Sequence, residues 1–245
     1  MEVHAHTHTA RKKWTHYFWE FLMLFLAVFC GFLAEYQLEH KIERDREKVY
    51  IKNLYEDLIS DTIIYDSYSK QTEEFGNKID SLFALLKSAN RNAHLDRIYL
   101  LARTATMGVA PQLFPNNRTY SQLKNSGLLR LIHNQNVANA VAEYYLYLEA
   151  IQTQNVTIIN RTGDYMNQIG GVLDAEVLLK ILKEDKQAVS GNLRLISEDP
   201  ATINQFLTAA QYYYGSRRNQ SIRGLIALQK ATGLIELMKK EYYLK

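Results

Sequence analysis

The sequence predicts an all-α protein in which one amino-terminal transmembrane helix continues into a helical stalk and a multi-helix bundle. The 245 residues include only 3 prolines and 11 glycines, too few for the many short turns of an all-β sandwich or barrel. Hydrophobic residues make up 47% of the chain, which excludes a disordered protein. Residues 21–34 are fourteen consecutive apolar positions, and apolar residues recur with helical spacing farther along the chain.

Residues 1–13 are predicted to form a histidine-rich, basic cytoplasmic leader. His4, His6 and His8 alternate, so an extended backbone would point all three imidazoles to one side, where they could bind zinc, nickel or copper. Three histidines without a fixed scaffold make a weak metal site. A flexible leader, or polar contacts within an oligomer, is the preferred interpretation.

Residues 14–36 are predicted to form the transmembrane helix. The eighteen residues from Tyr17 to Ala34 would make a helix of about 27 Å, close to the ~30 Å hydrocarbon core of a bilayer. Aromatic residues suited to the membrane interface flank the apolar run, namely Trp14, Tyr17 and Trp19 at one end and Tyr36 at the other. A buried core helix is the alternative, but no other part of the chain is nearly so apolar.

Basic residues in front of this segment predict its orientation. Arg11, Lys12 and Lys13 favour a cytoplasmic amino terminus, because Lys and Arg resist translocation. Residues 36–245 would then lie outside the cytoplasm, which in a Gram-negative bacterium is the periplasm, with the span in the inner membrane. Removal as a signal peptide fits poorly, because Phe32 stands where a small residue is expected.

Glu20 is an ionisable residue inside the apolar run, with His16 one turn earlier. The simpler interpretation is an interfacial carboxylate paired with His16 or Lys13. The alternative is a ring of such carboxylates in an oligomer, lining an ion path or carrying a proton, because ionisable residues within spans are commonly functional.

Residues 37–70 are predicted to be a helical stalk that enters the bundle, and residues 71–245 a helical periplasmic domain. Neither Gly nor Pro occurs between Gly31 and Gly76, so nothing in the backbone chemistry stops the first helix. The two prolines within 108–117 predict a break. Further helices are expected from about 118 with an interruption at Gly127, over 136–168, over 172–187, over 200–213 with Asp199 as N-cap, and over 217–242 after Gly215.

The chain contains 17 tyrosines, several of them in clusters. Consecutive tyrosines on a helix point in different directions, so some are expected to face outward and contact a protein partner. One cluster has arginines beside it, and these would either bind an acidic partner or simply solvate the start of the last helix. This candidate contact comprises Tyr212, Tyr213, Tyr214, Arg217 and Arg218.

No motif that the sequence offers supports catalysis or a cofactor. Gly-rich phosphate loops, His-Glu-x-x-His and the nucleophile elbow Gly-x-Ser-x-Gly are all missing from the sequence. The single cysteine, Cys30, permits neither an intramolecular disulfide nor a Cys-based zinc site. The net charge is +3 and comes mostly from the leader, so nucleic acid is not an expected partner.

Three segments resemble an uncharacterised family of single-pass membrane proteins common in Bacteroidota. They are WEFLMLFLAVFCGFLAE running on to REKVYIKNLYEDLISDT, then TYSQLKNSGLLRLIHNQNVANAVAEYY, and finally GLIELMKKEY. The resemblance touches about a third of the chain. It implies membrane anchoring and an all-helical extracytoplasmic domain, and it implies no activity. The histidine-rich leader and the strongly aromatic span depart from the family's usual start.

The sequence thus predicts a non-enzymatic, membrane-anchored scaffold, sensor or adaptor. Its expected partners are the lipid bilayer, further copies of the same chain, and a periplasmic or membrane protein. The alternative is an oligomeric ion-conducting or proton-coupled assembly that uses Glu20.

Overall fold

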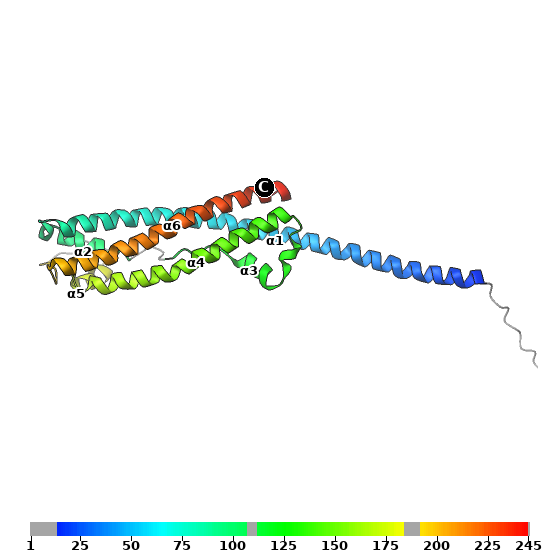
Figure 1. The fold of residues 1–245 in the computed structure, drawn as a ribbon, viewed down its shortest axis with the longest axis horizontal. Helices are drawn as coiled ribbons and strands as arrows, with labels where there is room; N and C mark the ends of the chain where they lie inside the picture. Colours follow the sequence, from blue (N-terminus) through cyan, green and yellow to red (C-terminus); the bar gives the residue numbers. More distant parts are fainter. Residues whose placement is uncertain (1–13, 107–111, 184–191, 245) are drawn as a thin grey trace, which may run out of the picture. The chain divides into compact units, whose positions relative to one another are not determined.

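The computed structural model describes residues 14–106, 112–183 and 192–244. These residues form the all-α fold that the sequence predicts, and among them no β-strand occurs beyond one isolated bridge between Leu173 and Leu195. The elements are α1 (Trp14–Lys87), η1 (Arg91–His94), α2 (Leu95–Thr104), α3 (Arg118–Asn125), η2 (Leu128–Leu131), α4 (Gln135–Ile169), α5 (Ala175–Lys183) and α6 (Pro200–Tyr242) (Figure 1).

The chain divides into two compact units, residues 1–49 and residues 50–245. Helix α1 runs without interruption through the boundary, as the lack of Gly and Pro between Gly31 and Gly76 predicts. The first unit therefore contains the apolar segment, and the second unit contains the rest of α1 with all the other helices.

Three long helices build the second unit: residues 50–87 of α1, α4 and α6 (Figure 1). Helix α6 runs antiparallel to α1, because Tyr68 forms a hydrogen bond with Gln220 whereas the later Phe75 packs edge-on against the earlier Tyr213. The same reasoning makes α6 antiparallel to α4, where Lys230 pairs with Glu143 and Gln220 with Asn155. Helices α1 and α4 are therefore parallel to each other.

The core of this bundle consists of two apolar clusters. One contains Leu54, Val141 and Ala231 among others, and the other contains Leu82, Ile98 and Phe206 among others. The short helices α2 and α5 pack with the second cluster, where the Tyr99 hydroxyl donates to the Arg194 carbonyl and accepts from the Asp174 amide. Helix α3 and η2 pack with the first cluster through residues such as Leu123 and Leu128.

Several predicted helix boundaries are confirmed. Helix α4 begins after Asn134, whose side chain accepts from the Asn136 and Val137 amides, and it ends before Gly170. Asp199 caps α6 by accepting from the Thr202 amide, with Pro200 at the first helical position. Gly127 interrupts the chain between α3 and η2 with φ at 68°.

The predicted break at Gly215 is wrong, because α6 is one helix from Pro200 to Tyr242. A glycine inside a helix costs only about 1 kcal/mol. The buried side chains on either side of Gly215, such as Tyr213 and Arg217, continue the packed face through it. The helix predicted over 172–187 is observed as Ala175–Lys183, and residues 184–187 lie outside the described part of the chain.

Candidate functional site

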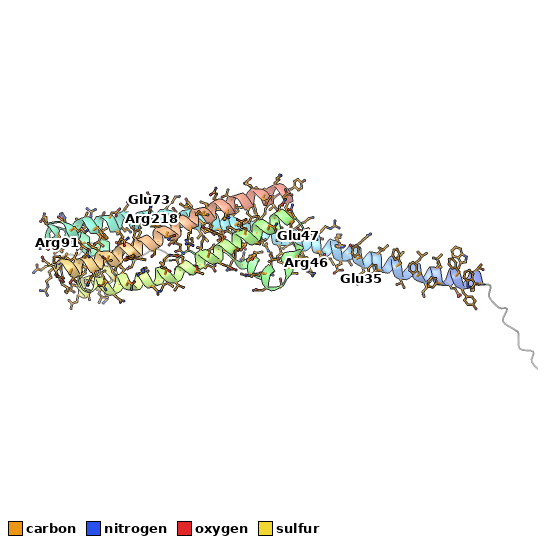
Figure 2. The ribbon with its side chains drawn as sticks, in the orientation of Figure 1. Glu35, Arg46, Glu47, Glu73, Arg91 and Arg218 are labelled. Carbon is orange, nitrogen blue, oxygen red and sulfur yellow. The ribbon has the colours of Figure 1, made fainter. Side chains whose placement is uncertain are left out.

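The apolar part of α1 is not buried against any other residue that the structure describes. Among the described residues, α1 is the one helix long and apolar enough to cross a membrane, with a mean hydropathy of 2.0 over its most apolar 18 residues and none of that window buried. The aromatic residues predicted at the interfaces, from Trp14 to Tyr36, are exposed. Figure 2 shows the side chains of this segment standing out on all sides of the helix.

Aromatic rings form a stripe along one side of this segment. Phe21 stacks on Phe25 and Phe25 on Phe29, with ring centroids 6.3 and 5.8 Å apart. Farther along, Phe32 stacks on Tyr36, and Tyr36 lies against His40 at 4.2 Å. With Trp14 and Phe18, which also stack, these rings recur at intervals of three or four residues, the spacing of a single helix face.

The opposite face of the same helix carries small and polar residues together with the exposed Met23. At about 100° per residue, Ala27, Gly31 and Ala34 lie roughly half a turn away from the aromatic stripe, and so do His16 and Glu20. A Cβ atom added at Gly31 would meet nothing within 4 Å. The segment is thus two-sided, with bulky rings on one side and a narrow face with one carboxylate on the other.

Glu20 and His16 lie as the sequence predicts, one turn apart and 3.2 Å between Oε1 and Nε2. Both side chains are about half exposed, 54% for Glu20 and 46% for His16. The alternative partner Lys13 lies outside the described residues.

The remaining predicted sites of the leader also lie outside the described residues. They are the candidate metal ligands His4, His6 and His8 and the basic flank Arg11, Lys12 and Lys13. Within the part of the chain that the structure describes, no group of three or more His, Cys, Asp or Glu is placed to hold a metal ion.

The predicted partner contact on α6 is divided between surface and core. Tyr212 is 53% exposed and Arg218 is exposed, so both stay available to a partner, and Tyr214 is half-buried. Tyr213 and Arg217 are buried, at 1% and 0% exposure. The prediction is wrong for these two residues, because the Arg217 guanidinium lies 4.9 Å from the Phe75 ring centroid and 5.8 Å from that of Tyr213.

A pair of buried carboxylates, which the sequence reasoning missed, lies at the centre of a polar cluster in the second unit. Asp57 and Asp61 lie one turn apart on α1, 1% and 0% exposed. Asp57 Oδ1 accepts from Asn116 Nδ2 at 2.7 Å and from the Arg118 guanidinium at 3.1 Å, and its Oδ2 accepts from the Thr119 amide at 3.1 Å. This carboxylate, from a different helix, therefore caps the start of α3.

Asp61 joins the same loop to α4. Its Oδ1 accepts from the Asn116 amide at 2.5 Å, and its Oδ2 accepts from the Tyr144 hydroxyl at 2.7 Å. The Tyr144 hydroxyl also lies 2.9 Å from that of Tyr65. Burial raises the pKa of Asp61 from 3.8 to about 6, against the hydrogen bonds from Tyr144 and Asn116, which lower it, and with a smaller increase from the charge of Asp57.

A second polar layer crosses the bundle between α1, α4 and α6. Tyr68 donates to Gln220 Oε1 at 2.9 Å, and Gln220 Nε2 donates to Asn155 Oδ1 at 2.5 Å. Asn155 in turn bonds both the amide and the carbonyl of Leu113, at 3.4 and 3.3 Å. These contacts satisfy buried polar groups and tie the loop before α3 to α4.

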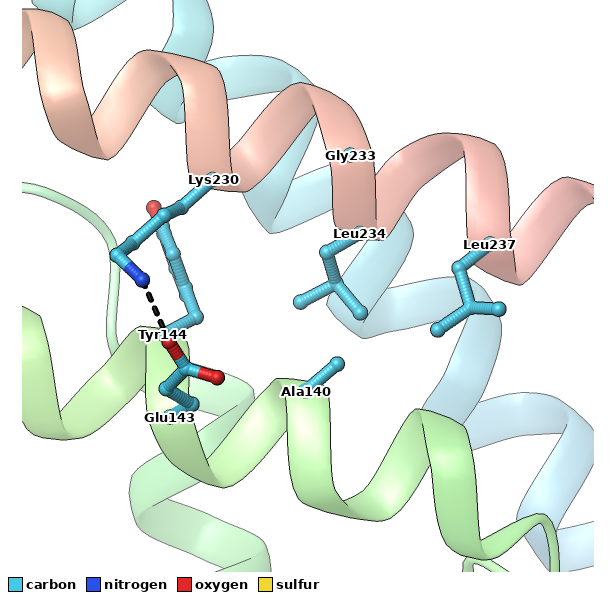
Figure 3. A pocket seen from close by; sticks show the side chains of 7 residues that line it. All are labelled: Ala140, Glu143, Tyr144, Lys230, Gly233, Leu234 and Leu237. Carbon is cyan, nitrogen blue, oxygen red and sulfur yellow. Dashed lines mark hydrogen bonds and ion pairs between the residues drawn. The ribbon is translucent and has the colours of Figure 1, made fainter.

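One surface pocket of the bundle is held together by an ion pair. The pocket between α4 and α6 is lined by Ala140, Glu143, Tyr144, Lys230, Gly233, Leu234 and Leu237 (Figure 3). Its only charged groups, Glu143 and Lys230, are bound to each other at 2.6 Å. This arrangement fixes two helices together and leaves no free acid, base or nucleophile in that pocket.

Comparison with known proteins gives no further assignment: no protein-family model, curated protein or solved structure matches the chain significantly.

Proposed function

We propose that the protein is a membrane-anchored helical scaffold, sensor or adaptor without catalytic activity, which assembles from several copies of the chain. The observation that carries the proposal is the apolar part of α1, in which none of the 18 most apolar residues is buried. Residues 14–36 contain 14 large hydrophobic side chains that are exposed. At about 1.5–3 kcal/mol for each such side chain fully buried, lipid would stabilise this segment by an amount on the order of 20 kcal/mol.

The proposed topology has residues 1–13 in the cytoplasm and the helical unit on the other side of the inner membrane, in the periplasm. The cations Arg11, Lys12 and Lys13 support this orientation. Trp14, Tyr17 and Trp19 would lie at the cytoplasmic interface and Tyr36 at the periplasmic one.

A second copy of the chain is the partner best suited to the narrow face of the span. Helices in lipid associate through small residues, which let two backbones approach closely, and through polar side chains. Ala27, Gly31 and Ala34 provide the first and Glu20 the second, while the aromatic stripe on the other side is suited to contact with lipid.

Membrane anchoring is tested by alkaline extraction and by flotation with liposomes. We expect the wild-type chain to stay with lipid, and a Leu24→Arg, Leu26→Arg variant to be released, because arginine near the centre of a span costs about 2.5–3.5 kcal/mol or more each. The matched control replaces Ile59 and Ile63, exposed apolar residues of the second unit, by arginine and should stay bound. Release of the wild-type chain from membranes by alkaline extraction would refute the proposed membrane anchor.

Assembly is tested by light scattering and cross-linking in detergent. Gly31→Leu and Ala34→Leu are expected to weaken association, because they widen the narrow face, whereas Phe25→Leu on the aromatic stripe should leave it unchanged. A wild-type chain that is monomeric at all concentrations would contradict the oligomer and leave the anchor intact.

An ion-conducting or proton-coupled assembly is the second candidate. It is favoured by the position of Glu20, which shares a face with the small residues and would therefore lie between copies rather than towards lipid. Glu20→Gln should abolish ion flux in reconstituted vesicles, and unchanged flux in that variant would exclude Glu20 as the conducting group.

A further inference from the structure

Residues 113–119, here termed the strap, lead into α3 and include its first two residues, and side chains of two long helices hold them. Asn155 of α4 binds the backbone of Leu113 through its amide group. At the other end, Asp61 and Asp57 of α1 bind the backbone amides of Asn116 and Thr119. The strap is thus fastened by hydrogen bonds from its own backbone to buried side chains.

The two carboxylates that hold the strap differ in their surroundings. Asp57 accepts from three donors, one of which is the Arg118 cation. Asp61 accepts from two neutral donors, the Asn116 amide and the Tyr144 hydroxyl, and within the part of the chain that the structure describes no cation forms a hydrogen bond or ion pair with it. Of the two buried carboxylates, Asp61 is therefore the one whose negative charge is less well compensated.

A proton on Asp61 fits the observed geometry without loss of the strap. If Oδ2 carries the proton, it can donate to the Tyr144 hydroxyl oxygen across the same 2.7 Å contact. Tyr144 can then donate to Tyr65, because either hydroxyl can be the donor across their 2.9 Å contact. The bond from the Asn116 amide to Oδ1 stays in place, so the neutral carboxyl still holds the strap.

Titratable and charged groups near Asp61 come from α1, α4 and the strap. Helix α1 contributes Asp57 and Tyr65, α4 contributes Tyr144 and Tyr145, and the strap contributes Arg118 through its pair with Asp57. Helix α6 faces this part of the core with uncharged residues, among them Gly224 beside Tyr65, and Ala227 and Ala231. The charge that acts on the pKa of Asp61 is that of another carboxylate, Asp57, and it opposes the ionisation of Asp61.

We propose that Asp61 is a proton-binding site that couples acidity to the strap: a protonated Asp61 keeps residues 113–119 closed over α1, and an ionised Asp61 favours their release. The inference goes beyond the scaffold proposed above, since it concerns the helical unit alone and gives it a stimulus to sense.

The direction follows from linkage. In the closed strap Asp61 has a pKa of about 6, whereas a solvent-exposed carboxyl keeps its ordinary value of 3.8. The closed form therefore binds the proton more tightly, and closure is favoured as the pH falls from about 6 to about 4. A difference of about two pKa units corresponds to a change of about a hundred-fold in the ratio of closed to open strap. Above and below this window the ratio is constant.

The experiment is hydrogen exchange of the full-length chain in detergent micelles between pH 4 and pH 7.5, with rates corrected for intrinsic exchange. Protection of the strap amides, those of Asn116 and Thr119 above all, should rise up to about a hundred-fold as the pH falls through the window. Asp61→Asn should show high protection at every pH. The matched control Asp66→Asn changes an exposed carboxylate of the same helix and should keep the pH dependence.

Flat protection in the wild-type chain would overturn the proposal, and so would an unchanged pH dependence in Asp61→Asn. If that variant does not fold, carboxyl carbon NMR of the wild-type chain decides, since Asp61 should titrate near pH 6 and a midpoint near 4 refutes the site. The hydrogen bond from Tyr144 lowers the pKa of Asp61, so Tyr144→Phe, which removes this bond, should move the midpoint of the titration upward. Tyr145→Phe should leave the midpoint unchanged. None of these results depends on whether the chain spans a membrane.

Discussion

Asp57→Asn separates two roles of a buried carboxylate: capping α3 and pairing with Arg118. Asparagine keeps the shape of aspartate but has one oxygen in place of two. Its amide nitrogen must face either the Thr119 amide or the Asn116 side-chain amide, both of which now donate to Asp57 at 3.1 and 2.7 Å. One buried donor is left without an acceptor, which costs about 1–3 kcal/mol, and the lost charge at the start of α3 costs about 0.3–1 kcal/mol more.

The expected loss of about 2–3 kcal/mol is measured by thermal or denaturant unfolding in detergent, followed by circular dichroism. For a unit of this size 1 kcal/mol shifts the Tm by about 2–4 °C, so Asp57→Asn should lower the Tm by about 5–10 °C. Arg118→Gln removes only the ion pair. Because the Arg118 side chain is 76% exposed, such a pair contributes about 0–1 kcal/mol, and the Tm should fall by no more than about 3 °C.

The two variants rank the two roles directly. If Arg118→Gln destabilises as much as Asp57→Asn, the ion pair is the dominant interaction and the capping argument fails. If Asp57→Asn leaves the Tm unchanged, the loop before α3 has rearranged to satisfy its donors, and the cluster does not hold it in place.

Three further outcomes follow from single positions. Tyr145→Phe should leave the unfolding free energy unchanged or slightly higher, because its buried hydroxyl has no hydrogen-bond partner among the described residues. Tyr144→Phe should lose about 1 kcal/mol; equal losses in denaturant titration would contradict this. Gly127→Ala should destabilise by about 1–2 kcal/mol because φ is 68° there, and Gly170→Ala, at φ −67° with open space around it, should not. Hydrogen bonds from Thr202 lower the pKa of Asp199, so its cap stabilises α6 above the ordinary carboxyl pKa and is lost as the pH falls through the lower folded value; an Asp199→Ala variant should lack this part of the acid dependence of the Tm.

Features of the fold that depend only on residues close together in the sequence could be predicted. The uninterrupted α1 follows from the missing Gly and Pro, and the ends of α4 and the start of α6 follow from Gly170 and from Asp199 with Pro200. These are local rules of backbone conformation and capping. The same local rules predict a break at Gly215, but α6 continues through it. The packing of the residues on both sides stabilises the helix by more than the free-energy cost of one glycine.

The buried polar clusters could not be predicted, since charge alone suggests exposure. Asp57 and Asp61 resemble ordinary surface acids of an amphipathic helix until the strap is placed against them. One signal is present in the sequence, because both aspartates occupy the same helix face as Leu54, Leu58 and Tyr65, whose helical spacing is typical of a core-facing stripe. A charged residue within an apolar stripe predicts a polar partner in the core, but the identity of that partner depends on tertiary structure.

The burial of the cation Arg217 could not be predicted from the sequence either. Its position beside Tyr212, Tyr213 and Tyr214 predicts a surface contact. Instead, three aromatic rings from α1 and α6 surround its guanidinium group. An arginine can occupy such a position because its planar, weakly hydrated cation stacks on aromatic faces. Lysine, with a compact and strongly hydrated ammonium, would not fit the same cage, so the tyrosines around Arg217 are better explained as the packing that accommodates a buried cation than as a docking surface. Of the five residues predicted to contact a partner, only Tyr212 and Arg218 are exposed on α6.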